Sequence, residues 1–334
     1  MSKTISNFTL LVLLLLASNA QSSGIDRFQV ERSDGSLIDY YIRNNSPAAR
    51  SNTILMVVQG SDCNSVARNA SVNDLKLAWP GADLLLIEKY GITSALTYSK
   101  NDEREDCPTD YLKMDSLDQR VSDILLVIKE VDTTGTYENF LMIGGSEGAV
   151  VANTVASITN SIDATASFNG GGRWFLDDVI HSIRYGKKDT PELRSEIEGF
   201  TEMASHIISN KQMDVEISGH GSRWWRSVLQ MDQLKQLGKV ESPLLILQSE
   251  KDQSVSVMNT NKMIDSLIKN GKKNISYIKY AELDHSFRNS RGESKLTDVV
   301  KDINRWFSVA VETDSNKAMQ GQAAKIQCFA QPEK

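Results

Sequence analysis

The stretch NFLMIGGSEGAV, residues 139–150, is the part of the sequence that decides the fold. Its first five residues, Asn139 to Ile143, form a short run typical of a strand buried on both faces of a parallel sheet. Glycines then surround Ser146 in the order Gly-Gly-Ser-Glu-Gly, and the small residues from Ala149 to Ile158 favour a closely packed helix. A glycine-rich turn between strand and helix predicts a strained backbone conformation for Ser146.

Further elements on both sides of this motif complete an alternating pattern. An antiparallel hairpin around Asp34-Gly35 begins it, and the last helix carries Val299 to Phe307. Between them the patterns predict strands and helices in alternation, which favours an α/β fold with a mostly parallel sheet flanked by helices. The predicted strands are 28–32, 37–43, 53–59, 82–88, 164–168, 243–248 and 275–280, and the predicted helices are 117–128, with Ser116 as N-cap, and 257–268.

One long segment interrupts this alternation. From Arg173 to about Val240 the sequence has helical periodicity and no clear strand. We interpret it as a helical lid inserted between two strands of the sheet.

The N-terminus has the features of a secretory signal. Lys3 precedes the apolar run Leu10 to Leu16, and Ser18 and Ala20 place small residues at a cleavage site. The run is too short to span a bilayer, although an uncleaved anchor is the alternative. We therefore predict a signal peptide over residues 1–20, a single domain over 21–334 with the insertion at about 173–240, and a periplasmic or secreted protein.

Composition narrows the classes of partner. The chain has 334 residues, 40% of them hydrophobic, which suffices for one large core. Its net charge is −6 and its pI about 5.4, so no basic surface predicts a nucleic-acid partner or, once the signal is removed, a membrane partner. The oligomeric state stays open.

The predicted export bears on the three cysteines of the chain, because disulfides form in oxidising compartments. Cys63 and Cys107 both fall in loops at the edge of the sheet that Ser146 is expected to occupy, so they are the preferred disulfide pair. Cys328 lies in a polar tail. No CxxC or HxxxH spacing is present, so we predict no metal site.

A serine nucleophile needs a base and an acid, and position in the chain suggests both. Of the four histidines only His285 follows the last strand, whereas His181, His206 and His220 lie in the predicted lid. Asp252 follows the strand 243–248, and the order Ser146, Asp252, His285 suits a triad. The competing carboxylates are Glu250 and Asp284.

Two main-chain N–H groups are candidates for an oxyanion hole. One belongs to Glu147, at the start of the helix after Ser146, and the other to Ser61, in the loop after the strand 53–59. Gly60 lets this loop approach a substrate closely, and a disulfide at Cys63 would stiffen it. A simple strand-end turn is the alternative for this loop.

Aromatic residues in the predicted lid suggest a binding surface. An apolar or aromatic group of a substrate could contact them, and Arg223 or Arg226 could bind a carboxylate. Alternatively, the tryptophans only anchor the lid to the body. The aromatic candidates are Trp174, Phe175, Trp224 and Trp225.

The ordered set QGSDC, GGSEG, SEKDQSV and LDHSF, each after an apolar strand, resembles the α/β-hydrolase superfamily. The resemblance covers about Phe28 to Phe307, near the prolyl-oligopeptidase-like and ester-cleaving branches of exported bacterial hydrolases. The sequence departs from them at Gln59, which replaces the histidine of the usual His-Gly pattern.

This resemblance implies a serine hydrolase that forms an acyl-enzyme and needs no cofactor. The expected substrate is a small-molecule ester or thioester. The alternatives are a peptidase that cleaves short peptides with the same triad and a non-catalytic binding protein on the same fold.

Overall fold

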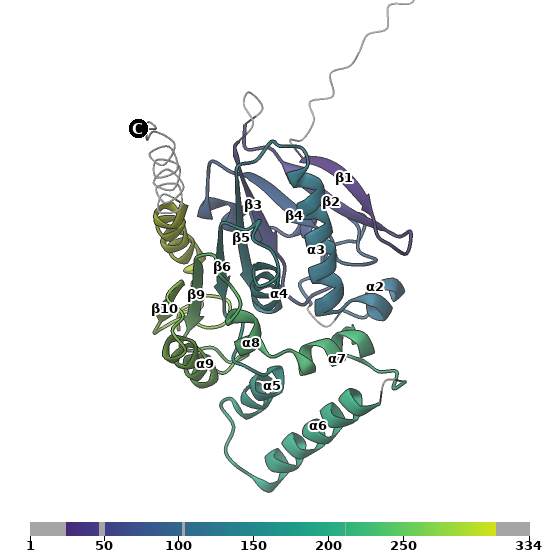
Figure 1. Cartoon of the computed structure of the whole chain (residues 1–334). Coiled ribbons are helices and arrows are strands. Elements are labelled where there is room, and N and C mark those ends of the chain that lie inside the picture. Colours follow the sequence, from purple (N-terminus) through teal and green to yellow (C-terminus); the bar gives the residue numbers. More distant parts are fainter. Residues whose placement is uncertain (1–24, 47–50, 102–103, 211, 312–334) are drawn as a thin grey trace, which may run out of the picture.

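The computed structural model describes residues 25–46, 51–101, 104–210 and 212–311. The predicted signal peptide and Cys328 lie outside these ranges. The central element is an eight-stranded sheet in the order β1-β2-β4-β3-β5-β6-β9-β10 (Figure 1). The strands are β1 (Ile25–Glu31), β2 (Leu37–Arg43), β3 (Thr53–Val58), β4 (Asp83–Ile87), β5 (Asn139–Gly145), β6 (Ala164–Phe168), β9 (Leu244–Ser249) and β10 (Ile275–Tyr280).

The sheet is antiparallel at one side only. β1 pairs with β2 and β2 with β4 in antiparallel register, and all other neighbours are parallel. The strands from β3 to β10 therefore present their carboxyl ends at one edge. The predicted fold class, a mostly parallel sheet flanked by helices, is confirmed.

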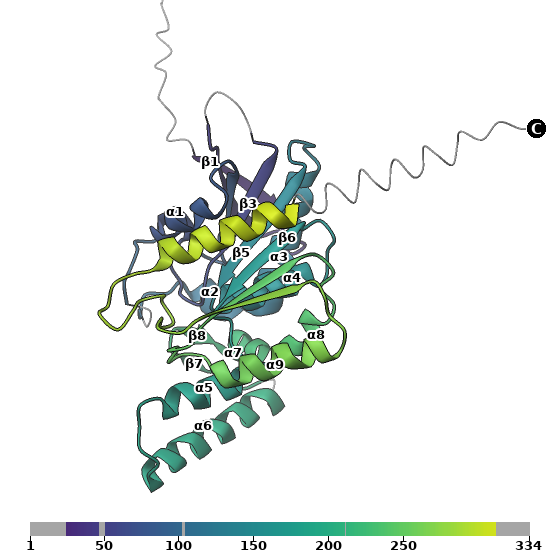
Figure 2. The ribbon, with the colours of Figure 1, turned by 90° about the vertical axis from the view of Figure 1, so that its left-hand side faces the viewer.

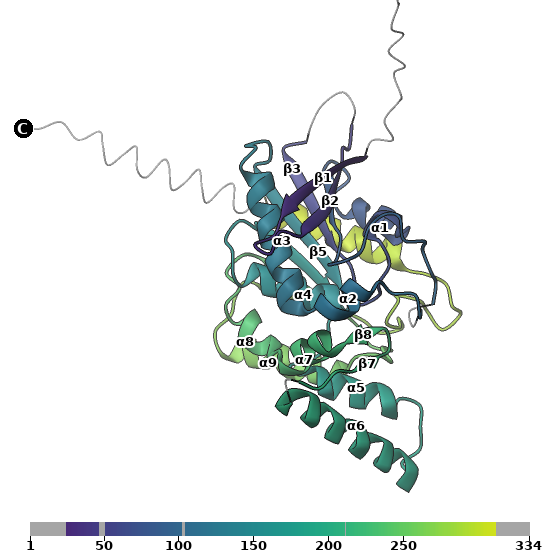
Figure 3. The same cartoon turned by 90° about the vertical axis from the view of Figure 1, so that its right-hand side faces the viewer.

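Helices cover both faces of the sheet. Ile54 and Met56 of β3 pack in the core on one face, and Leu55 and Val57 pack in the core on the other. The first face is covered by α3 (Leu117–Asp132), α4 (Glu147–Ala156) and α9 (Val257–Lys269), and the second by α1 (Ser71–Leu75) and a helix over residues 296–311 (Figures 2 and 3). Ser116 caps α3, since its hydroxyl accepts the Gln119 N–H at 3.1 Å, as predicted.

Short helical elements between β3 and β4, and between β4 and α3, have no clear signal in the sequence. They are the 3₁₀ turns η1 (Val66–Arg68) and η2 (Lys76–Ala78), the helix α1 between them, and α2 (Thr109–Met114). Each has six residues or fewer, too few for a helical period to repeat.

The segment between β6 and β9 is mainly helical, and it stands beyond the carboxyl edge of the sheet with α6 farthest out (Figures 1 and 3). The sequence predicted no strand within residues 173–240. This was wrong, because β7 (Glu216–Ile217) and β8 (His220–Gly221) pair as a small antiparallel ribbon. Their turn uses positive φ at Ser218 and Gly219, and two-residue strands are too short to show alternation. The segment contains α5 (Phe175–Arg184), α6 (Pro191–Ser209), β7 (Glu216–Ile217), β8 (His220–Gly221), α7 (Ser222–Gln230) and α8 (Gln233–Leu237).

None of the helices in the described ranges combines the length and the hydropathy that crossing a membrane requires.

Candidate active site

Ser146 occupies the sharp turn between β5 and α4. Its φ of 53° and ψ of −128° lie in a region that side chains rarely adopt. Gly144 and Gly148 make the turn possible: an added Cβ on either would lie 2.2 Å from a main-chain oxygen, Gly148 O or Val58 O respectively. Glycine is therefore required at both positions, for steric reasons that the sequence motif already indicated.

Asp252 and His285 are joined in the structure. The imidazole Nδ1 lies 2.8 Å from Oδ2 of Asp252 and 3.0 Å from Oδ1. Asp252 is 1% exposed, and its Oδ1 also accepts the N–H groups of Ser254 and Val255 at 2.8 and 2.9 Å. A carboxylate that only accepts hydrogen bonds requires the proton on Nδ1, which leaves Nε2 as the basic nitrogen.

The two competing carboxylates have other partners. Glu250 forms an ion pair with Lys279 at 2.7 Å. Asp284 accepts the N–H groups of Ser286 and Arg288. Of the three carboxylates that the sequence offered, Asp252 is the one that contacts the imidazole of His285.

Ser146 and His285 lie at the same edge of the sheet, linked through the end of β6. The Ser146 N–H donates to Phe168 O at 3.0 Å, and the side-chain amide of the next residue after Phe168, Asn169, donates to the main-chain oxygen of His285 at 2.9 Å. Within the described residues no hydrogen bond joins the Ser146 hydroxyl to the His285 imidazole. Serine–base contacts are often long without substrate and shorten when it binds.

The loop after β3 lies directly above Ser146. A Cβ built on Gly60 would be 3.8 Å from the Cβ of Ser146. Ser61 and Glu147, whose N–H groups were predicted to form the oxyanion hole, line the same cavity as Ser146.

This cavity has a volume of about 120 Å³ and a mostly apolar wall. Val150 of α4, Phe175 of α5 and Trp224 of α7 supply three sides of it. It therefore lies between the body of the molecule and the helices that follow β6. The remaining wall is formed by Leu117, Gly170, Asp178, Val228, Met231, Gln233 and Val255.

Of the predicted substrate contacts, Phe175 and Trp224 line this cavity, and Trp224 is the one tryptophan among them. Trp225 packs against Phe175, and its indole donates to Ile217 O, whereas Trp174 lies beneath the guanidinium of Arg173. These partners all lie within residues 173–240, so the contacts join parts of the segment to one another.

The arginines of the same segment also have partners away from the cavity. Arg223 contacts the sulfur of Met114, and Arg226 donates to the main-chain oxygens of Ile207 and Asn210. Neither guanidinium lies among the residues that line the cavity beside Ser146.

A buried group of charged side chains next to the nucleophile was missed by sequence reasoning. The carboxylate of Glu147 forms an ion pair with Arg120 and accepts the Trp224 indole N–H at 2.5 Å. Burial alone would raise the pKa of Glu147, but the charges of Arg120 and Lys89 outweigh it and lower that pKa. Burial also raises the pKa of the nearby Asp115 to about 6, against the attraction of Lys89. No motif marks such a cluster, since its members come from different elements.

His220 was set aside because of its position, yet the structure places it beside this cluster. Its ring stacks on Trp224 with centroids 3.7 Å apart, and Nδ1 lies 3.2 Å from the Tyr111 hydroxyl. Burial lowers the pKa of His220 to about 4, so the ring is neutral near pH 7. It is a packing and hydrogen-bonding residue here.

Asp178 in the cavity wall is a second buried carboxyl. It accepts the N–H groups of Ser256 at 2.8 Å and Gly172 at 3.1 Å. Burial raises its pKa to about 7.

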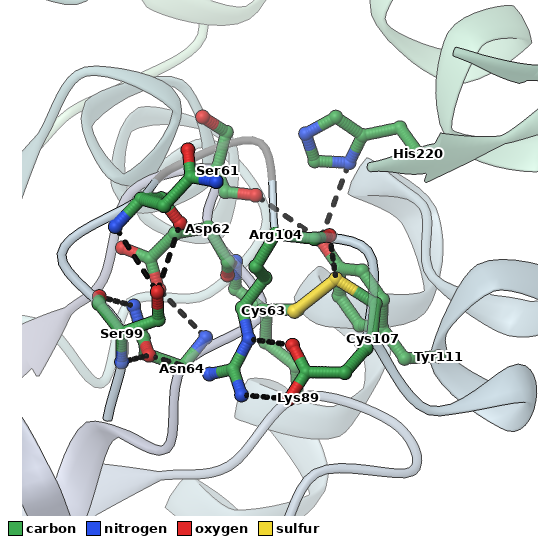
Figure 4. The surroundings of a disulfide bond; sticks show 12 residues. Ser61, Asp62, Cys63, Asn64, Lys89, Ser99, Arg104, Cys107, Tyr111 and His220 are labelled. Carbon is green, nitrogen blue, oxygen red and sulfur yellow. Dashed lines mark hydrogen bonds and ion pairs between the residues drawn. A yellow bond between two sulfur atoms is a disulfide. The ribbon is translucent and has the colours of Figure 1, made fainter. Parts of the chain in front are cut away.

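A disulfide joins Cys63 and Cys107, the preferred pair, across 44 residues (Figure 4). It fixes the loop after β3 to the segment that precedes α2. Within the described ranges, no three His, Cys, Asp or Glu side chains are placed to share a metal ion.

Comparison with known proteins places this geometry in context. The model of the Prolyl oligopeptidase family matches residues 109–313, more than half of the chain. No curated protein matches the sequence.

Solved structures resemble the fold over most of the chain. Est1E from Butyrivibrio proteoclasticus, with ferulic acid bound, is 13% identical, with a TM-score of 0.57 over 85% of this chain and 99% of that one. A Pyrococcus furiosus esterase is 12% identical, with a TM-score of 0.54 over 86% and 92%. A Pyrococcus horikoshii acylaminoacyl peptidase is 16% identical, with a TM-score of 0.54 over 85% and 41%. Identities this low show a shared fold alone.

Proposed function

The chain belongs to the prolyl oligopeptidase family and is a serine hydrolase, and from that premise we propose that it cleaves carboxylic esters with a triad of Ser146, His285 and Asp252. The observation that carries the proposal is the hydrogen bond between His285 Nδ1 and the buried Asp252, at the edge where the strained Ser146 stands.

The reaction proceeds by two acyl transfers. Nε2 of His285 takes the proton of the Ser146 hydroxyl as that oxygen attacks the ester carbonyl, and then gives it to the leaving alcohol. Water repeats the sequence on the acyl-enzyme and releases the acid. The N–H groups of Glu147 and Ser61 stabilise the oxyanion, and one such donor contributes about 10²- to 10³-fold in kcat. The contact between Ser146 and His285 forms when substrate is bound.

The lining of the cavity beside Ser146 supports the proposal that the acyl group of the substrate is uncharged and apolar. Glu147 and Asp178 are the ionisable residues of its wall, and both are engaged with protein partners. An engineered apolar cavity of about 150 Å³ holds benzene, so a cavity of about 120 Å³ suits a short aliphatic or small aromatic acid.

The segment between β6 and β9 acts as a lid in this proposal. Its helices α5 and α7 contribute Phe175, Trp224 and Val228 to the cavity wall, so opening it would expose the acyl site. A disulfide beside the site is compatible with an oxidising compartment, and we infer that the protein is periplasmic or secreted.

A peptidase that uses the same triad is the second candidate, favoured by the family match. The two are separated by comparing p-nitrophenyl esters with aminoacyl-p-nitroanilides. We expect kcat/KM to be at least about 100-fold higher for esters of short acids, and the reverse order would identify a peptidase.

Replacing the nucleophile tests the enzyme itself. Ser146→Ala should lower kcat by about 10⁴-fold or more and abolish labelling by a fluorophosphonate probe, with an unchanged melting temperature. Near-normal turnover in this variant would reject the triad, and failure of the unmodified protein to label would favour a binding protein.

A further inference from the structure

The oxyanion loop, residues 59–62, is held by side chains to an unusual degree. Each of its four successive carbonyl oxygens accepts a hydrogen bond from a buried side chain, part of which Figure 4 shows. Arg120 donates to Gln59 O at 2.6 Å, Lys89 to Gly60 O at 2.6 Å and to Asp62 O, and the Tyr111 hydroxyl to Ser61 O at 3.1 Å.

These bonds determine where the N–H groups of the loop point. In a planar trans peptide the C=O of one residue and the N–H of the next point in opposite directions, and the described chain has no cis peptide. Lys89 draws the Gly60 carbonyl inwards, so the Ser61 N–H in the same peptide points outwards. Ser146 is close to this peptide, since a Cβ on Gly60 would approach the Cβ of Ser146 to 3.8 Å, and Ser61 and Ser146 line the same cavity. No hydrogen bond within the described chain uses the Ser61 N–H, which leaves it available.

The environment of Lys89 argues against a purely stabilising role. The side chain is 4% exposed, and burial lowers its pKa. No carboxylate in the described chain lies within ion-pair distance of its ammonium, although Glu147 and Asp115 are close enough to feel its charge. The ammonium donates to two carbonyl oxygens of the loop and lies 5.6 Å from the centre of the Tyr111 ring. A buried charge held in this way costs stability, and an apolar residue of similar shape is often at least as stable.

We propose that Lys89 is a positioning residue for the oxyanion hole, which holds the Gly60 carbonyl so that the Ser61 N–H points at the oxygen that becomes charged during acyl transfer. The ammonium also polarises this peptide and makes its N–H a stronger donor. The inference rests on the proposed function of Ser146.

The test compares Lys89→Met with Lys272→Met. Lys272 also donates from its ammonium to a main-chain oxygen, Val240 O, but it precedes β10 at the opposite edge of the sheet. In Lys89→Met we expect kcat to fall about 10²-fold with KM changed less than about threefold, and fluorophosphonate labelling to slow in proportion. Lys272→Met should keep the kcat of the unmodified protein.

A second variant identifies the peptide that matters. Tyr111→Phe frees the Ser61 carbonyl, which shares its peptide with the Asp62 N–H. We expect a loss in kcat below about tenfold. A loss equal to or larger than that of Lys89→Met would make Asp62 the donor and overturn the proposal.

Circular dichroism and urea unfolding check that each variant is folded. If Lys89→Met is unfolded, Lys89→Gln takes its place. Its amide is uncharged and one bond closer to the backbone than the ammonium, so it should not hold the Gly60 carbonyl as Lys89 does, and kcat should again fall while KM is retained. A folded variant of either kind with kcat within about threefold of the unmodified protein overturns the proposal. Near-normal kcat in a folded Lys89 variant, together with an inactive Ser146→Ala variant, rejects the role of Lys89 and leaves the triad standing.

Discussion

The two halves of the candidate site are held in different ways. Asp252, on the acid side, is fixed by main-chain N–H groups of the residues two and three positions further along the chain. On the nucleophile side, Glu147 and the oxyanion loop are fixed by the buried charged side chains of Arg120 and Lys89.

The difference lies in how local the support is. The turn that follows Asp252 supplies its own donors, so a short sequence specifies it. On the nucleophile side, each supporting contact joins two residues that are between 27 and 61 positions apart in the sequence. Each contact therefore depends on correct packing of several elements. We therefore expect substitutions on the acid side to affect chemistry most, and those on the nucleophile side to affect chemistry and stability together.

Among the residues that support the nucleophile and the base, the largest effect is expected from Asp252→Asn. The amide oxygen can still accept the Ser254 and Val255 N–H groups, which turns its NH₂ towards His285 Nδ1 and places the imidazole proton on Nε2. That tautomer cannot act as the base, so kcat should fall about 10³- to 10⁴-fold with little change in stability. Steady-state ester hydrolysis measures it. Glu250→Gln is the matched control, and a comparable loss there would mean that the acid is misassigned.

Next in size is Arg120→Met on the nucleophile side. It leaves the Glu147 carboxylate buried without its ion-pair partner, which should lower the free energy of unfolding by about 3–5 kcal/mol. Urea denaturation measures this, and the double variant Arg120→Met/Glu147→Gln should recover part of the loss. Arg173→Met, which breaks the more exposed pair with Asp232, should cost less than about 1 kcal/mol. Equal losses for the two arginines would show that the buried pair of Arg120 contributes no more to stability than an exposed pair, and that the nucleophile side does not depend on it.

The disulfide adds a covalent anchor to the nucleophile side. Closing a loop of this length stabilises by about 2–4 kcal/mol, so the double variant Cys63→Ser/Cys107→Ser should unfold at correspondingly lower urea concentration. Because Lys89 and Tyr111 still hold the oxyanion loop, kcat should fall less than about tenfold. A folded but inactive double variant would show that the disulfide, and not the side-chain contacts, positions the loop.

Asp178 of α5 gives the smallest effect. It tests the acid side because it accepts the N–H of Ser256, in the loop that contains Asp252. Its pKa is raised to about 7 in the fold, so the folded chain keeps a proton that the unfolded chain has released above about pH 4. Stability should therefore fall as pH rises from 5 to 7, by about 1–2 kcal/mol. Asp178→Asn should lack this part of the pH dependence in urea titrations at several pH values. The same slope in both proteins would show that Asp178 is ionised throughout.

Long-range contacts explain what sequence reasoning missed. Lys89 directly follows the predicted strand 82–88, and Arg120 lies within an amphipathic helix, but neither position shows a period or motif that indicates a buried charge. Trp225 was predicted to contact substrate as one of the aromatic residues of the predicted lid, and Arg223 as a cation for a substrate carboxylate. Both adjoin Trp224, yet on α7 adjacent residues face different directions.

The sequence by itself determined the sheet, its helical cover and the chain order of Ser146, Asp252 and His285. These follow from local causes: apolar runs that must be buried, and glycines without which the turn at Ser146 would clash. The tertiary structure alone decided which carboxylate holds His285, which tryptophan reaches the cavity and which charges share the interior beneath the oxyanion loop. Such contacts form through space between distant residues, and they leave no periodic trace along the chain.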